Sequence, residues 1–521
     1  MISVLFHTLG CKLNQLETEA ISDAFRQAGC TILSGNGGQP DLCIINTCTV
    51  TSKAEQKARR IIRFYLRRNC AVIVTGCYAQ LEKEQLESLS QGPLYGNSPL
   101  NGGPLFVVPG RAKDRLLDLP SFLAKEKADT VLLRGVLAHW LETKGGGQKT
   151  KDDNTGRKVN RKATAAAFRF NPRNFSFHSR AFLKIQDGCD RNCAYCRVSL
   201  ARGRSVSLEA EEILCRLKAL EEAGLAEAVI TGVNIAQYRN PENPAVGLPA
   251  LLRFLLDNTE RIALRLSSIE PDFCEPDFDS GTGFETKLQG RIFGGEFYEL
   301  LSSSRIRGHF HLSVQSGSDK ILAAMGRPYG ARHIIKMVED IRGVKDDPFL
   351  ACDIITGFPG ESDGDFEKTA ELCRIADFAW IHAFPYSKRP GTRAAFIKGQ
   401  VEQRIAGERL LELTRLARQG RERYVRRWKG KTVEAVAETD SGETNTGCPP
   451  PFFHALTENY IRVRVPFNKT FCRLLPGTSF RCRIGRGAEE GENAFDAWAE
   501  PEGALNSTEI NFQPPACAGR W

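Results

Sequence analysis

Residues 184–196 read KIQDGCDRNCAYC and place Cys189, Cys193 and Cys196 at a C-x3-C-x2-C spacing. Thiolates are soft ligands that suit zinc or iron–sulfur clusters. A zinc site would need a fourth ligand and usually a second pair of cysteines. Three cysteines instead fit a four-iron cluster that keeps one iron open for chemistry. The polar residues between the cysteines indicate a loop, which disfavours packing of three small side chains in a core. We therefore predict an open four-iron cluster here.

The chain around this motif alternates strands and helices. Expected strands cover residues 182–185, 228–231, 263–266, 309–314, 351–356 and 380–384, with helical patterns such as 208–223 and 332–344 between them. Six strand–helix units of this kind predict a partial (β/α)6 barrel, with its site at the carboxyl ends of the strands. Segments rich in glycine and polar residues follow those ends, at 232–234, 267–270, 315–318 and 357–361.

A second cysteine triad is spread over the first part of the chain. Cys11 lies in TLGCKLN, Cys48 in NTCTVT and Cys77 in TGCYAQ, and each follows an expected strand. Those strands alternate with helices, which predicts an open parallel α/β domain. Ligand sites in such domains form just beyond the carboxyl ends of the strands, so the three thiols are expected to meet there. The alternative is that they are ordinary buried cysteines.

Composition marks out the remaining parts of this α/β chain. Residues 142–177 are polar, glycine-rich and basic, which is typical of a flexible linker and not of a packed element. Short expected strands at 432–437, 460–465 and 479–484 predict a small β-barrel. The expected parts are an N-terminal α/β domain at 1–141, the linker at 142–177, the large barrel at 178–403, a basic helix at 404–428, the small β-barrel at 429–500 and a tail at 501–521. We also expect an insertion at 272–294 and a loop at 441–453.

Size and composition exclude several classes of protein. A chain of 521 residues with 17 cysteines is not a small disulfide-linked secreted scaffold. The start, MISVLFHTLG, lacks the basic region of a secretion signal, and no apolar stretch reaches the length of a membrane span. We expect a cytoplasmic protein without membrane contact, whose cysteines are free, catalytic or metal-bound. The net charge of +9 permits a phosphate-rich partner.

The compact triad, with Tyr195 before its last cysteine, resembles the radical S-adenosylmethionine (SAM) superfamily. The resemblance implies that the open iron binds SAM and that the reduced cluster cleaves it to a 5′-deoxyadenosyl radical, while the protein orients the reactants. It also implies that Tyr195 packs near the adenine of SAM. The other residues that would line the SAM pocket are Gly232, Asn234, Ser268, Glu270, Gln315 and Gly357. For the glycines among them, the alternative is a role in turns.

The motifs of the dispersed triad resemble those of the methylthiotransferase N-terminal domain. ARGRSVS at 201–207, DIITGFPGE at 353–361 and FPYSKRPGTRA at 384–394 resemble further segments of that family. The resemblance covers nearly the whole chain, except the linker, the insertion and the tail. It implies that Cys11, Cys48 and Cys77 hold a second, auxiliary four-iron cluster. It also implies that the small β-barrel is an RNA-binding barrel of the TRAM type.

The amino-acid sequences of these motifs are most similar to those of the branch that modifies N6-threonylcarbamoyladenosine next to the tRNA anticodon. This resemblance implies transfer of a methylthio group to carbon 2 of the adenine. One SAM would donate the methyl group, another would generate the radical, and the auxiliary cluster would carry the sulfur. The implied partners are tRNA, SAM, an external electron donor and a sulfur source. Open alternatives are isopentenyladenosine in tRNA or a ribosomal-protein aspartate as the substrate, and a non-catalytic iron–sulfur electron carrier.

Two basic runs favour an RNA partner. Residues 53–68 hold seven basic residues and one acidic residue, and residues 404–431 hold ten and three. Such charge binds phosphates in a salt-sensitive way. The alternative is a solvated helix face. A base in a single-stranded loop can be splayed out to reach a buried site at low cost.

Overall fold

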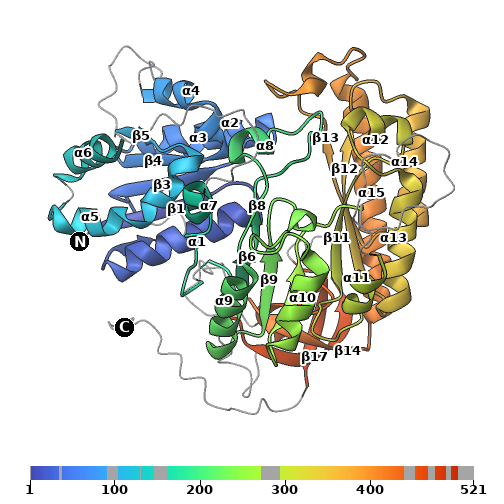
Figure 1. The fold of residues 1–521 in the computed structure, drawn as a ribbon. Coiled ribbons are helices and arrows are strands. Elements are labelled where there is room, and N and C mark those ends of the chain that lie inside the picture. The colour runs from blue at the N-terminus through green and yellow to red at the C-terminus, as the bar shows by residue number, and fades with distance from the viewer. Residues whose placement is uncertain are drawn as a thin grey trace.

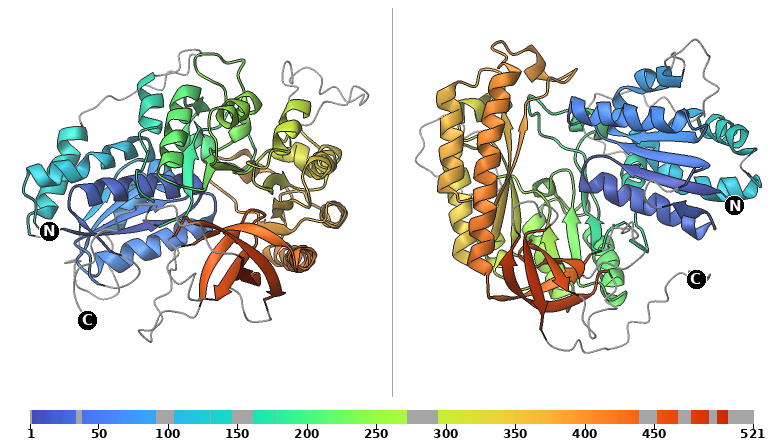
Figure 2. Two further views of the ribbon diagram at one scale, coloured as in Figure 1. Left: turned by 90° about the horizontal axis from the view of Figure 1, so that it is seen from below. Right: turned by 180° about the vertical axis from the view of Figure 1, so that it is seen from behind.

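The structure is a computed structural model, and its parts pack into the three-part arrangement seen in Figures 1 and 2. It describes residues 2–33, 38–90, 104–129, 131–145, 161–175, 177–271, 294–438, 452–466, 476–488 and 495–502. The insertion expected at 272–294 lies outside these ranges except for its last residue, and so do residues 441–451 of the expected loop and the tail beyond residue 502.

The N-terminal part is a parallel sheet, as predicted. Its strand order is β2-β1-β3-β4-β5, and all four neighbouring pairs are parallel. The strands are β1 (Ser3–Thr8), β2 (Thr31–Leu33), β3 (Leu42–Thr47), β4 (Ala71–Gly76) and β5 (Leu105–Val107). Helices α1 (Lys12–Gln27), α2 (Ser52–Leu66) and α3 (Cys77–Leu81) each follow one of these strands. Central strands β3 and β4 are buried throughout, because helices cover both faces of the sheet.

The central part is a six-stranded open barrel made of two parallel half-sheets. One half-sheet has the order β10-β9-β6 and the other β11-β12-β13, and a bridge between Ile269 and Leu312 joins them. The strands are β6 (Ala181–Lys184), β9 (Glu227–Thr231), β10 (Ala263–Leu266), β11 (His309–Gln315), β12 (Phe349–Thr356) and β13 (Trp380–Pro385). No strand pairing joins β6 to β13 among the described residues, so the barrel is open on the side that faces the N-terminal sheet.

Helices cover the outer face of this barrel, as Figure 1 shows. They are α9 (Ala210–Glu222), α10 (Leu248–Asp257), α11 (Gly294–Leu301), α12 (Asp319–Met325), α13 (Ala331–Val344), α14 (Asp363–Ile375) and α15 (Gln403–Trp428). One continuous apolar core fills the space between the strands and these helices, from Leu183 in β6 to Leu413 and Ala417 in α15. The predicted partial (β/α)6 barrel is therefore confirmed.

The C-terminal part is a small closed barrel with the strand order β14-β15-β16-β18-β17. Its strands are β14 (Thr432–Ala437), β15 (Phe452–Thr457), β16 (Arg462–Pro466), β17 (Ser479–Gly487) and β18 (Ala497–Pro501). The sequence predicted three of these strands and missed β15 and β18. β15 begins inside the stretch that was expected to be a loop, and β18 ends one residue into the expected tail. The core of this barrel continues into Phe349 and Ala351 at the start of β12.

The prediction that residues 142–177 hold no packed element is wrong in part. Helix α6 (Leu133–Gly145) reaches into this stretch, and α7 (Arg161–Ala167) lies wholly within it. Phe168 and Phe170 after α7 are buried, and Phe170 joins the core of the N-terminal sheet. Burial of two phenylalanines outweighs the polar composition of their neighbours. Residues 146–160, which carry most of that composition, lie outside the described residues.

Candidate functional site

The structure brings the dispersed triad together at one end of the N-terminal sheet. Cys11 precedes α1, Cys48 follows β3, and Cys77 is the first residue of α3 after β4. All three line the same cavity. Burial, followed by the neighbouring Cys11 and Cys77, raises the pKa of the Cys48 thiol to about 12. The convergence predicted from the strand ends is therefore present, because the strands are parallel and adjacent.

Two glycines let the backbone close around these cysteines. A side chain at Gly10 would meet the Cys48 sulfur at 3.0 Å, and Gly10 has a φ of +111°. A side chain at Gly76 would meet the Thr47 carbonyl oxygen at 2.3 Å, with a φ of +100°. Both positions need glycine, because only glycine adopts this backbone conformation at low cost and leaves room for the neighbouring strand. Gly10 and Gly76 directly precede Cys11 and Cys77, so each glycine positions the thiol of the cysteine that follows it.

The compact triad lies on a loop between β7 (Gln186–Asp187) and α8 (Val198–Arg202). The backbone N–H groups of Arg191 and Val198 each donate to a cysteine sulfur, Cys189 and Cys196, at 3.4 Å. Burial raises the pKa of Cys189 to about 12 and that of Cys196 to about 11, with neighbouring cysteines contributing.

The backbone donors to Cys189 and Cys196 fit iron–sulfur ligands, and thiols lose their protons when they bind a metal. Backbone donors to sulfur are a recognised way of tuning an iron–sulfur cluster. Within the described ranges no three His, Cys, Asp or Glu side chains are arranged to hold a single metal ion. In a four-iron cluster each thiolate binds a different iron, so the three sulfurs need not converge on one point.

Residues around the compact triad form a charged wall. Glu270 accepts hydrogen bonds from Arg191 at 3.1 Å and from Arg327 at 2.6 Å. Arg327 also donates to the Tyr195 hydroxyl. Arg327 and Glu270 both act on the Cys193 thiol electrostatically. Tyr195 and Glu270 therefore lie beside the cysteines, and their contact with SAM stays a prediction.

The other predicted SAM-pocket residues lie in different surroundings. Gly232 and Ser268 line the large cavity, whereas Gly357 packs against Ala406 of α15, where an added Cβ would come within 2.5 Å. The backbone N–H of Asn234 donates to Gln186, which lies three residues before Cys189. Gln315 is buried at the end of β11 with a φ of +69°, a left-handed conformation that is rare outside glycine. Whether these residues contact SAM stays a prediction.

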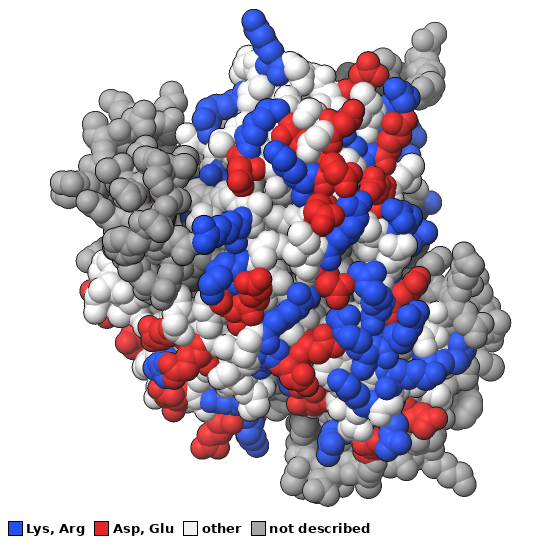
Figure 3. Space-filling model, turned by 90° about the vertical axis from the view of Figure 1, so that its right-hand side faces the viewer, with Lys and Arg blue, Asp and Glu red and all other residues white. Residues whose placement is uncertain are grey.

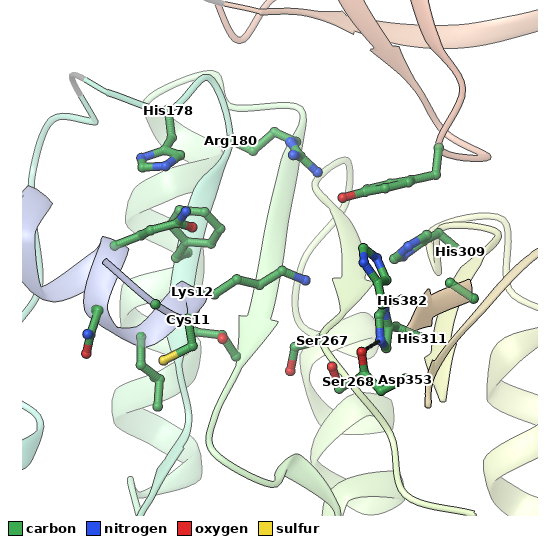
Figure 4. A pocket seen from close by; sticks show the side chains of 18 of the residues that line it. Cys11, Lys12, His178, Arg180, Ser267, Ser268, His309, His311, Asp353 and His382 are labelled. Atoms are coloured by element: carbon green, nitrogen blue, oxygen red, sulfur yellow. Dashed lines mark ion pairs between the residues drawn. The ribbon is translucent and has the colours of Figure 1, made fainter. Parts of the chain in front are cut away.

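A cavity of about 1260 Å³ runs between the three parts of the chain. Its walls include the dispersed triad, the strand-end residues Ser267 and Ser268, and Tyr460 of the small barrel. Figure 4 shows the side of the cavity where Lys12 and Arg180 face His311, Asp353 and His382. The three cysteines of the compact triad are not among its lining residues.

Comparison with known proteins identifies both cysteine-bearing parts. A family model described as uncharacterized protein family UPF0004 matches residues 3–93, and the Radical SAM superfamily model matches residues 183–373. The chain is 37% identical to "Threonylcarbamoyladenosine tRNA methylthiotransferase MtaB" of Treponema pallidum, over 89% of this chain and 95% of that protein. The protein of the same name from Thermotoga maritima is 30% identical over 84% of this chain and 87% of its own length.

The chain belongs to the radical SAM methylthiotransferase family. Its membership implies SAM and one four-iron cluster as cofactors. The chain is also 28% identical to "tRNA-2-methylthio-N(6)-dimethylallyladenosine synthase" of Fervidobacterium nodosum over 84% of its length and 89% of that protein's. Among solved structures, the cobalamin-bound radical SAM methyltransferase TsrM of Kitasatospora setae matches with a TM-score of 0.44 and 15% identity, covering 75% of this chain and 76% of that one.

In this methylthiotransferase a buried ion cluster joins the two cysteine-bearing parts. Glu17 on α1 accepts from Lys113, Lys184 and Arg202, and Asp187 accepts from Lys184 and Arg202. Burial raises the pKa of Glu17, but these cations, Arg202 first, outweigh burial and hold it well below its ordinary value. The cations are thereby matched by carboxylates, which a buried ion cluster requires.

Arg202 lies six residues after Cys196 of the compact triad. Its charge also acts on Cys77, where burial is the larger influence on the thiol pKa. One arginine thus connects the loop of the compact triad with the site of the dispersed triad. Arg202 belongs to the segment ARGRSVS, but the sequence predicted no role for it, because its partners Glu17 and Asn14 lie about 185 residues away.

A second contact holds the same two parts together. Arg197, next to Cys196, donates to Glu82 at 2.6 Å and to Thr49 at 3.3 Å. Arg389 donates to Glu55 and to the same Thr49 hydroxyl. Thr49 directly follows Cys48, so each triad has a neighbouring residue in this contact. The two triads are therefore held by one rigid framework of buried polar contacts.

Proposed function

We propose that this protein adds a methylthio group to carbon 2 of N6-threonylcarbamoyladenosine in tRNA. The observation that carries the proposal is the meeting of Cys11, Cys48 and Cys77 in a cavity whose opposite wall is the radical SAM barrel. The names of the relatives support this choice of nucleoside, since those that are 30% or more identical over most of the chain include several threonylcarbamoyladenosine enzymes. We place the reaction in the cytoplasm, where tRNA is modified. None of the described helices is long and apolar enough to cross a membrane.

We further propose that the dispersed triad holds a second four-iron cluster. When bound, the two clusters would supply the electron that cleaves SAM and the sulfur that is transferred, with an external electron donor and a sulfur source completing the reaction. The residues of the protein would hold and orient the reacting groups. Tyr195 and Glu270 line the compact triad's loop, and Arg202 keeps the two sites in register. A radical step is needed because the hydrogen on carbon 2 is not acidic.

The small barrel and α15 are proposed to bind the tRNA backbone. Figure 3 shows Lys and Arg side chains gathered in the lower part of one face, at the level where Figure 1 places the small barrel. Several cations of this region are exposed, namely Arg415, Arg418, Arg426, Lys429 and Lys431. Others on α15 are already paired, such as Arg427 with Asp347 and Asp377. The exposed cations that have no carboxylate partner in the described part of the chain would contact phosphates, which predicts salt-sensitive binding.

Mass spectrometry of digested tRNA from a deletion strain tests the substrate. Loss of the 2-methylthio derivative of threonylcarbamoyladenosine is the expected result. A loss confined to the isopentenyladenosine derivative, or an unchanged tRNA profile with a changed ribosomal protein, would refute the substrate.

Two cysteine variants separate the roles of the two triads. In reconstituted protein, Cys193→Ala should abolish formation of 5′-deoxyadenosine from SAM. Cys48→Ala should keep that cleavage and stop methylthio formation. Methylthiolated tRNA from Cys48→Ala would show that the auxiliary-cluster assignment is wrong. A wild-type protein that never consumes SAM would be an electron carrier instead.

A further inference from the structure

Lys12 is the first residue of α1 and directly follows Cys11 of the dispersed triad. Its side chain lines the large cavity, and Figure 4 shows it reaching toward the space between Arg180 and Ser267. Within the described residues its ammonium group makes no hydrogen bond and no ion pair. The charges that act on it are the cations Arg180 and Arg265 and the carboxylates Glu227 and Asp353. No carboxylate in the described part of the chain pairs with this cation, which leaves it available to an anion bound in the cavity.

Most other cations of the cavity wall already have carboxylate partners. Arg202 binds Glu17 and Asp187, and Arg421 binds Asp496. His311 contacts Asp353 at 3.0 Å.

Arg180 is the exception beside Lys12. It approaches Glu227 only to 3.6 Å, and that carboxylate is already held by two hydrogen bonds from Arg265 at 2.6 and 2.7 Å. Lys12 and Arg180 therefore form a pair of cations on one side of the cavity with capacity for one further anion. Planar carboxylates suit an arginine and lysine pair of this kind.

We propose that Lys12, assisted by Arg180, binds the threonine carboxylate of the substrate nucleoside and so selects threonylcarbamoyladenosine. This inference rests on the proposed function and assigns the substrate-specificity residues of the same site. In the adenine ring, carbon 2 and carbon 6 are both bonded to nitrogen 1. A group on the N6 nitrogen therefore lies only a few bonds from carbon 2. Lys12 adjoins a ligand of the predicted sulfur-carrying cluster, so it can hold that group while carbon 2 faces the cluster.

The same arrangement would reject an isopentenyl group. An apolar substituent would displace water from Lys12 and give its charge no partner, which costs binding free energy. Sites built around a polar or charged group of the substrate discriminate strongly against analogues that lack it. Lys12 would therefore act through binding, and it takes no part in breaking or forming bonds.

Binding of matched RNAs to the reconstituted holoenzyme tests this inference. Three anticodon stem-loops would differ only at one nucleoside, carrying threonylcarbamoyladenosine, its methyl ester or unmodified adenosine. Fluorescence anisotropy without SAM gives the dissociation constants. The wild type should bind the free carboxylate about tenfold more tightly than the ester, as expected for one charge-assisted contact. The unmodified loop should bind like the ester, because its phosphates are unchanged.

Lys12→Met should remove the preference for the carboxylate, and Lys12→Arg should keep most of it. Lys218→Met removes the same charge from the exposed face of α9, and this control should behave like the wild type. Arg180→Met is a second variant at a position that does not adjoin a cluster cysteine, and it should also reduce the preference. If Lys12→Met loses iron, Arg180→Met still tests the inference. Iron content of each variant shows whether the clusters are intact.

The outcomes separate this inference from the function it rests on. If both variants keep the tenfold preference, Lys12 and Arg180 do not bind the carboxylate, while the proposed function stands. If Lys12→Met weakens all three RNAs equally, the anion is a backbone phosphate and the inference is wrong. If the wild type shows no preference and methylthiolates an isopentenyladenosine loop instead, the proposed function itself is refuted.

Discussion

Replacement of Glu227 by glutamine is expected to destabilise the protein by about 3 kcal/mol at pH 7. Glu227 begins β9 and is 2% exposed. Its carboxylate accepts two hydrogen bonds from Arg265, and Arg307 lies 3.3 Å away. Burial raises the pKa of Glu227, but Arg265 and the other arginines outweigh burial and lower it from 4.5 to about 2.

The magnitude follows from that pKa. The difference between a pKa of 4.5 and one of about 2 corresponds to about 3 kcal/mol of stabilisation of the charged form in the folded state. The carboxylate is buried, so solvent screens its interaction with the arginines only weakly. Removal of one partner from a buried ion pair independently predicts roughly 3–5 kcal/mol, because the side chain of Arg265, which is 1% exposed, would lose its anion.

Urea unfolding at constant m value measures this loss. Glu408→Gln is the matched control, since Glu408 pairs with Arg404 on the surface of α15 with side-chain exposures of 59% and 70%. It should cost about 0.3–0.5 kcal/mol, as exposed helix pairs do. A Glu227→Gln loss no larger than that of the control would refute the reasoning.

The effect also has a definite pH dependence. The folded-state pKa lies below the unfolded one, so the stabilisation is fully present above about pH 4.5 and is lost as the pH falls toward 2. By pH 3.5 the difference between wild type and Glu227→Gln should have shrunk by roughly 1 kcal/mol. A difference that stays constant down to that pH would show that the charge of Glu227 is not its source.

Two further substitutions test the site of the dispersed triad. Gly76→Ala should cost about 3 kcal/mol or prevent folding, because the new methyl group would lie 2.3 Å from the Thr47 carbonyl oxygen. Gly29→Ala has a similar φ of +83° but open space, so it should cost only about 1 kcal/mol, and equal losses in chemical denaturation would contradict the close-approach argument. Cys48→Ala should lower the iron content of anaerobically reconstituted protein from about eight to about four per chain, whereas the buried Cys43→Ala should leave it unchanged. Eight irons in Cys48→Ala would show that this cysteine is not a ligand.

Regular elements with a strong local pattern were predicted well from the sequence. The central strands of both parallel sheets are buried on both faces, so they read as short continuous apolar runs with helices between them. The elements that were missed lack such a pattern. β2 has three residues and begins with the exposed Thr31. Phe168 and Phe170 lie next to a polar stretch that dominated the interpretation of that region.

The candidate site also has a part that the sequence predicted and a part that it did not. The cysteines of both triads stand out by residue type and motif, and their place after strand ends follows from local patterns. The charged residues around them do not follow from local patterns. Glu17 and Lys184 are 167 positions apart, and Arg197 and Glu82 are 115 apart. Such pairs form only after strand order and packing have placed the side chains, so no local signal reports them.

The sequence by itself determined which residues we propose to carry the chemistry: three cysteines at one loop and three that follow separate strands. Tertiary structure decided how these groups face one another. It placed Arg202 between the two triads, and it left Lys12 facing the cavity beside Cys11 with no partner among the residues that the structure describes. The physical reason is the distance along the sequence between residues that interact. Backbone conformation and burial follow patterns of a few residues, whereas the pairing of charges depends on how whole sheets and helices pack.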